Sequence, residues 1–216
     1  MPVVFVLVAD PVGAGLIASL PRPGGNMTGF APIVPSLAGK WAELIKEIAP
    51  GIIRASMLFN PQSATFIESY VEPFKTATSA LGIEAVISPV ENMDAVEAQV
   101  TAEARKSNSA LVVIPDAFTE LQRAKIVALT VRHGIPAINW SRSFESGGLI
   151  SYGPFLIEEY RRGAIYADRI LEGEKPSELP VQTPVKFELV INTKAAQTPG
   201  LKVPPALLAR ADAVIE

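Results

Sequence analysis

Strand-like and helix-like segments alternate regularly between residues 54 and 139, and this alternation constrains the fold more than any other feature. Short apolar runs with the length of buried strands occur at 54–59, 83–88, 110–114 and 137–139. Helical stretches separate these runs, at 64–81, 94–106 and 119–133. Strands that alternate with helices in this way predict a doubly wound, flavodoxin-like parallel α/β sheet.

A further apolar run, residues 3–9, begins almost at the start of the chain. All-apolar strands are normally buried in the middle of a parallel sheet, so this strand should have neighbours on both sides. No basic segment precedes the run and no small-residue cleavage site follows it, so it does not match a signal peptide. It is also far shorter than the roughly 20 apolar residues of a membrane helix. We therefore expect upstream elements of this sheet to be absent from the chain.

The pattern changes after Gly147 and Gly148, which predicts a second lobe. A strand at 185–191 lies outside the regular block, and we expect it to share a sheet with residues 3–9. The prediction is an incomplete first lobe, 1–30 plus 149–216, and a complete second lobe, 31–148. Two lobes with paired chain crossings are typical of a hinged protein that closes around a ligand.

Composition argues against several functions. The formal charge is −3, with 19 basic and 22 acidic residues, so there is no basic excess for nucleic acid. There is no cysteine, and His133 is the only histidine. A thiolate site, a histidine-based triad and a His-rich metal centre are therefore not expected. We predict a binding protein without catalytic residues, metal or cofactor.

Ligands of open α/β sheets sit beyond the carboxyl ends of the strands. Five residues with polar or aromatic side chains occupy such positions and are the candidate ligand contacts: Asp10, Asn60, Asp116, Trp140 and Tyr152. Structural roles are the alternative for each of them. The Asp and Asn residues adjoin prolines and can start turns, while the two aromatic residues can pack at a lobe interface or hinge.

Several sequence strings together resemble one family, the ABC transporter substrate-binding proteins of the tryptophan/tyrosine type. The strings are Asp10-Pro11-Val12, PGGNMTG at 23–29, Asn60-Pro61, GGLISYG at 147–153, ILEGEKP at 170–176, KFELVIN at 186–192 and VPPALLARAD at 203–212. They cover essentially the whole chain in collinear order.

The resemblance implies a type I periplasmic-binding fold, a small-molecule ligand in the inter-lobe cleft, permease subunits as partners and a periplasmic location. It also implies a signal peptide and about three strand–helix units upstream of Met1. On this basis Asn60, Asp116 and Trp140 would be second-lobe contacts, while Asp10 and Tyr152 would belong to the first lobe or hinge. An amino acid or aromatic ligand would suit stacking on the tryptophan and an ammonium group beside the carboxylates.

Two other functions share this fold class. One is the effector-binding domain of a lac-repressor-type regulator, which would need a DNA-binding segment that this sequence does not contain. The other is an α/β enzyme that uses the same crevice. We also expect a homodimer through first-lobe elements, because an incomplete sheet exposes an edge and an apolar face.

Overall fold

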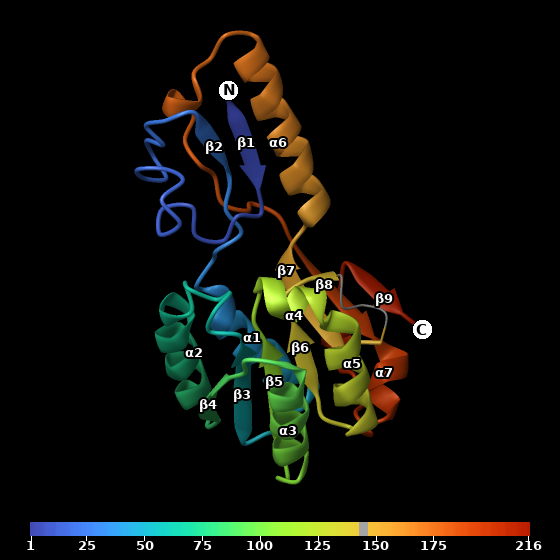
Figure 1. Ribbon diagram of the computed structural model, residues 1–216. Helices are drawn as coiled ribbons and strands as arrows, with labels where there is room; N and C mark the ends of the chain where they lie inside the picture. The colour runs from blue at the N-terminus through green and yellow to red at the C-terminus, as the bar shows by residue number, and fades with distance from the viewer. Residues whose placement is uncertain (143–146) are drawn as a thin grey trace. The chain divides into compact units, whose positions relative to one another are not determined.

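The computed structural model describes residues 1–142 and 147–216 of the chain (Figure 1). The described residues form two compact units. Unit 1 comprises residues 1–34 and 154–187, and unit 2 comprises residues 35–153 and 188–216. The chain therefore passes between the units three times, after residues 34, 153 and 187.

Unit 2 is built on a seven-stranded sheet with the order β4-β3-β5-β6-β7-β8-β9. Its strands are β3 (Arg54–Phe59), β4 (Glu84–Pro89), β5 (Ser109–Val113), β6 (Ala137–Asn139), β7 (Ile150–Pro154), β8 (Phe187–Asn192) and β9 (Ala213–Ile215). The first five run parallel to one another, and β9 runs parallel to β8. Every residue of β5 is buried, as expected for a strand covered on both faces.

Helices cover both faces of this sheet. They are α1 (Leu37–Ile48), α2 (Glu68–Ala80), α3 (Met93–Ala104), α4 (Ala117–Leu121), α5 (Arg123–Arg132), α7 (Thr193–Gln197) and α8 (Pro205–Leu208). Figure 1 shows α3 and α5 together on one face and α1 on the other, where α1 packs against α2. The doubly wound α/β class predicted from the sequence is confirmed.

The strand order reverses direction at β3. The chain passes from β3 to β4 on one side and then returns through α3 to β5 on the other side of β3. Open α/β sheets bind ligands at such a reversal, because the two crossover connections leave in opposite directions and a crevice forms between them. The reversal between β3 and β5 is therefore the expected binding position of unit 2.

Unit 1 contains two short parallel strands, β1 (Val3–Val6) and β2 (Met27–Phe30), the long helix α6 (Leu156–Leu171) and the 3-10 helix η2 (Pro176–Glu178). Figure 1 shows α6 lying along β1. Gly163 allows this close packing, because a Cβ at this position would lie 2.8 Å from Val6 Cγ2.

The strand predicted at 185–191 exists as β8, but its predicted partner is wrong. β8 lies between β7 and β9 in the sheet of unit 2, and not beside β1. The main-chain bonds from Phe155 N to Lys186 O and from Asn192 N to Leu149 O fit an antiparallel β7–β8 pair. Residues 149–153 and 188–216 consequently belong to unit 2, which is larger than the predicted lobe 31–148.

Two of the predicted helices differ from the structure in detail. The segment predicted as one helix, 119–133, is divided at Gln122 into α4 and α5. The helix predicted at 94–106 begins earlier, because Asn92 caps α3 by accepting a hydrogen bond from Ala95 N at 3.0 Å.

Candidate functional site

Asn60 and Asp116 meet at the reversal point of the unit 2 sheet. Asn60 directly follows β3, and Asp116 lies three residues after β5. The backbone N–H of Asn60 donates to Asp116 Oδ2 at 3.0 Å. Both residues are buried, with exposed fractions of 4% and 5%. Two residues that the sequence suggested separately are therefore in direct contact at the position where this fold class binds ligands.

The Asp116 carboxylate is surrounded by donors. Its Oδ1 accepts hydrogen bonds from Ser63 Oγ at 2.9 Å and from Thr119 N at 2.8 Å. The second of these bonds caps α4, and the Thr119 hydroxyl returns to the Asp116 backbone N–H to complete a capping box. Burial raises the pKa of Asp116, while the hydrogen bonds from Asn60, Thr119 and Ser63 act in the opposite direction. The carboxylate thus holds the loop after β3 and the start of α4 together.

The Asn60 side chain also shapes its own loop. Its Oδ1 accepts from Gln62 N at 2.9 Å, and its Nδ2 donates to Glu91 O, beyond β4, at 3.1 Å. The amide therefore ties the loop after β3 to the loop after β4. This is the turn-forming role that the adjacent proline made an alternative in the sequence.

Trp140 follows β6, the next strand along the same edge of the sheet. Its side chain is buried, yet its indole Nε1 has no hydrogen-bond partner among the described residues. Its main chain lies close to Gly153, where a Cβ would stand only 1.6 Å from Trp140 O. Only glycine fits there without movement of the backbone.

Tyr152 lies within β7, beside β6. Its carbonyl oxygen accepts a hydrogen bond from Trp41 Nε1 at 2.7 Å. Trp41 is fully buried in α1 and stacks on Tyr70 with the ring centroids 5.8 Å apart. The main chain at Tyr152 is therefore fixed to the core of unit 2, and its side chain is half-buried.

Asp10 belongs to unit 1, after β1. Its Oδ1 accepts from Gly13 N at 2.8 Å, and its carbonyl accepts from Ala14 N at 3.0 Å. These are turn-forming bonds. The structure thus places Asn60, Asp116, Trp140 and Tyr152 along one sheet edge of unit 2 and Asp10 in the other unit.

Sequence reasoning missed three polar residues with structural importance. Ser63 and Thr119 hold the Asp116 carboxylate, and the Asp-x-x-Thr spacing of a capping box was the available signal for Thr119.

Glu159 of α6, in unit 1, is 1% exposed and pairs with Arg162 Nη1 at 3.3 Å through one oxygen. Its other oxygen, Oε2, has no partner among the described residues, and burial raises its pKa.

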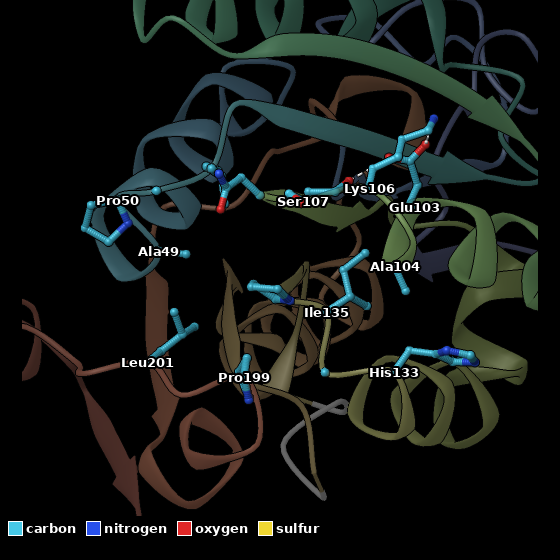
Figure 2. A pocket seen from close by; sticks show the side chains of 16 residues that line it. Ala49, Pro50, Glu103, Ala104, Lys106, Ser107, His133, Ile135, Pro199 and Leu201 are labelled. Carbon is cyan, nitrogen blue, oxygen red and sulfur yellow. Dashed lines mark hydrogen bonds and ion pairs between the residues drawn. The ribbon is translucent and has the colours of Figure 1, made fainter.

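A cavity of about 320 Å³ opens at the opposite, amino-terminal edge of the unit 2 sheet (Figure 2). Glu103 and Lys106 lie together at one side of it, and their side chains pair at 3.1 Å. Burial by itself raises the pKa of Glu103, but hydrogen bonds from Ser109, Arg54 and Lys106 outweigh it and leave the pKa below its ordinary value. The Glu103 carboxylate is thus fully engaged by neighbouring side chains, and the edge is not where this fold class binds ligands.

The described residues hold neither a metal-binding cluster nor a membrane-spanning helix. Within residues 1–142 and 147–216, no group of three His, Asp or Glu side chains comes together to hold a metal ion. In the same ranges, no helix is long and apolar enough to cross a membrane.

Comparison with known proteins identifies the family. The profile of ABC transporter substrate binding proteins matches residues 1–215. The chain belongs to this family. The resemblance inferred from the sequence strings is therefore confirmed.

Solved structures of two similar proteins support this assignment. The ABC domain of Streptococcus pneumonia in complex with L-Trp is 27% identical, with a TM-score of 0.86 over 99% of this chain and 72% of that chain. A conserved domain protein from Vibrio cholerae is 32% identical, with a TM-score of 0.86 over 99% of this chain and 71% of that chain. A LacI family regulator from Bifidobacterium animalis subsp. lactis shares the fold at 13% identity and a TM-score of 0.53.

A curated tyrosine-binding protein of Clostridioides difficile is 24% identical over 195 residues. The match covers 89% of this chain but 55% of the relative. The chain thus spans about half the length of the curated relative that it matches.

Proposed function

We propose that the chain is the ligand-binding component of an ABC importer and that it binds a small, amino-acid-like molecule between its two units. The family assignment over residues 1–215 supports the transport role. The ligands of two similar proteins, L-Trp and tyrosine, support an aromatic amino acid as the ligand class. On this proposal the protein acts outside the cytoplasmic membrane and delivers its ligand to permease subunits.

The contact between Asn60 and Asp116 is the observation that carries the binding proposal. It lies where the strand order reverses, and the hydrogen bonds of these two buried residues connect the loops that follow β3, β4 and β5. A binding site needs polar groups that are fixed before the ligand arrives, because ordering them on binding would reduce the affinity. Loops that are held together in this way are suited to present main-chain groups to a small ligand.

The proposed roles of the candidate residues follow from their positions. Asn60 and Asp116 shape the loops of unit 2, while Trp140 and Tyr152 supply aromatic surface along the same edge. Asp10 is the proposed contribution of unit 1. A ligand held by both units would favour a closed form of the protein, with the three chain crossings as the hinge. The permease would recognise that closed form.

Ligand-dependent stabilisation tests this function. Thermal unfolding should be followed with a panel of amino acids, including tryptophan, tyrosine and phenylalanine, and with several sugars. A ligand at 100 times its dissociation constant adds about 2.7 kcal/mol of stability. We expect the aromatic amino acids to raise the melting temperature. Stabilisation by sugars alone would favour an effector domain of the lac-repressor type, and turnover of a bound compound would favour the enzyme alternative.

We further propose that the chain forms a homodimer through α6. An exposed apolar stripe runs along this helix with spacings of three and four residues, which places its members on one face. The α6 stripe consists of Ile157, Tyr160, Ala164, Ala167 and Leu171. Its large members are 56%, 59% and 86% exposed at positions 157, 160 and 171. Heptad-like spacing of this kind is typical of helices that pair along their length.

The charges beside the stripe support a second copy of the chain as the partner, packed in the antiparallel direction. Arg161 and Asp168 flank the stripe on the same side and lie at nearly equal distances along the helix from Ala164. If a second copy of α6 packs antiparallel about Ala164, each Arg161 comes opposite the Asp168 of the other copy. This charge complementarity favours a second copy of the chain as the partner.

A further inference from the structure

Trp140 carries a buried hydrogen-bond donor for which none of the described residues supplies an acceptor. Its Nε1 has no partner among residues 1–142 and 147–216, although the side chain is only 7% exposed. Buried N–H groups without partners are rare, because they lose their hydrogen bonds to water and gain nothing in exchange. The indole N–H of a buried tryptophan normally finds an acceptor.

The other tryptophan shows how this chain treats an indole that serves only the core. Trp41 is fully buried, and its Nε1 donates to Tyr152 O at 2.7 Å. Trp41 thus has an acceptor within the protein, whereas Trp140 has none among the described residues. Both belong to unit 2.

Trp140 lies at the sheet edge where this fold class binds ligands. It follows β6 at the edge where Asn60 and Asp116 meet after β3 and β5, and these three strands are neighbours in the sheet. The Asp116 oxygens already accept bonds from Asn60 N, Ser63 Oγ and Thr119 N. Asp116 therefore stabilises the loops, whereas the unsatisfied group at this edge is a donor that requires an acceptor.

Among the described residues, one other buried side-chain atom lacks a hydrogen-bond partner, and it differs from the indole N–H. Glu159 Oε2 lies in unit 1, and its carboxylate already has Arg162 as an ion-pair partner through its other oxygen. Arg162 in turn donates to Thr183 O at 3.1 Å. The Glu159 charge is thus compensated within unit 1, while the Trp140 donor has no comparable partner among the described residues.

We propose that Trp140 Nε1 donates a hydrogen bond to a carboxylate of the ligand and thereby selects acids over the corresponding amines. An ionised acceptor forms a shorter and stronger bond with N–H than a neutral one. A site with a buried donor also discriminates strongly against analogues that lack the acceptor, because the donor then stays unpaired. This inference rests on the proposed function and adds the group that the ligand must carry.

Binding of matched compounds to the full chain tests the proposal. The compounds are L-tryptophan and L-tyrosine, the decarboxylated amines tryptamine and tyramine, and the deaminated acids indole-3-propionate and 3-(4-hydroxyphenyl)propionate. We expect Trp140→Phe, which keeps an aromatic ring but removes the N–H, to weaken the carboxylate-bearing compounds at least tenfold, about 1.4 kcal/mol. Any binding of the amines should change much less. The control Trp41→Phe should leave the preference for acids over amines unchanged.

A second measurement is made on the wild-type chain and needs only one of the two variants to fold. The wild-type chain has two tryptophans, so its 1H–15N spectrum contains two indole signals, which either single-tryptophan variant assigns. Saturation with a carboxylate ligand should move the Trp140 signal downfield and leave the Trp41 signal in place. An unmoved Trp140 signal, or equal affinities of the acids for wild type and Trp140→Phe, overturns this inference and leaves the proposed function intact. Failure of every compound to bind the wild-type chain overturns both.

Discussion

Replacement of Asp116 by asparagine tests the junction between the loops of unit 2. The amide is nearly the same size as the carboxylate, but it has one acceptor oxygen where the carboxylate has two. That oxygen can still accept from Thr119 N or Ser63 Oγ. The NH2 group then faces the Asn60 backbone N–H, which loses its 3.0 Å acceptor. Two donors therefore meet in a buried place.

The expected loss follows from these bonds. A buried donor left without a partner costs about 1–3 kcal/mol, and a hydrogen bond to a charged group contributes about 1.5–3 kcal/mol. Part of this is offset, because the neutral amide avoids the burial of charge that raises the pKa of Asp116. We expect Asp116→Asn to lower the free energy of unfolding of unit 2 by about 2–3 kcal/mol. In a domain of this size that corresponds to roughly 5–10 °C in melting temperature.

Tryptophan fluorescence is the suitable assay, because Trp41 and Trp140 both lie in unit 2 and report on its unfolding. Urea unfolding of wild type and Asp116→Asn gives the difference directly. Asp10→Asn is the matched control, since the new amide oxygen can still accept from Gly13 N, and we expect a change below about 0.5 kcal/mol. A loss at Asp116 no larger than at Asp10 would show that the junction does not stabilise the loops.

Three other predictions follow from described contacts. Hydrogen bonds hold the pKa of Glu103 below its ordinary value, so its contribution to stability is present above the unfolded-state pKa and is lost as the pH falls. Glu103→Gln should therefore lower the free energy of unfolding in urea more at pH 7 than at pH 3. Equal losses at the two pH values would contradict the lowered pKa. Gly153→Ala places a methyl group against Trp140 O and should lower the free energy of unfolding by about 1–3 kcal/mol, whereas an unchanged denaturation midpoint would show that the backbone yields freely. Tyr160→Lys on the α6 stripe should convert the dimer to a monomer, as measured by light scattering. Ile165→Lys is the control, because Ile165 is equally exposed but lies off the stripe, and it should leave the dimer intact. A monomeric wild type at micromolar concentration would refute the dimer.

The α/β class of unit 2 was predictable because its signals are local. The strands are short apolar runs with helical stretches between them, and the alternation of types then selects a doubly wound sheet. The general rule for ligands in such sheets also selected Asn60 and Asp116. Their direct contact was not predictable, since it depends on which two strands lie on either side of the reversal.

The position of β8 was not predictable for the same reason. The string KFELVIN has the apolar content of a strand, and a strand is what it forms. Periodicity does not say which neighbour a strand pairs with, and pairing with β1 was the simpler arrangement. In the structure β8 pairs with β7, which joins the last segment of the chain to unit 2.

Glu159 shows a different limit. A glutamate in an amphipathic helix, next to Glu158 and near two arginines, has the pattern of a solvated face. Its burial depends on α6 packing closely on β1 at Gly163 and on the position of Arg162. These contacts are tertiary. Likewise, the sequence suggested Trp140 as a candidate aromatic contact, but only the structure shows that its N–H lacks a partner among the described residues while that of Trp41 is bonded.

The central claim is that this chain binds an amino-acid-like ligand, and isothermal titration calorimetry tests it most directly. L-tryptophan and L-tyrosine should be titrated separately into the purified chain. The account predicts saturable binding of at least one of them with one ligand per chain, and a lower affinity for its decarboxylated amine. The absence of heat at millimolar ligand, for these and for the other amino acids, would contradict it.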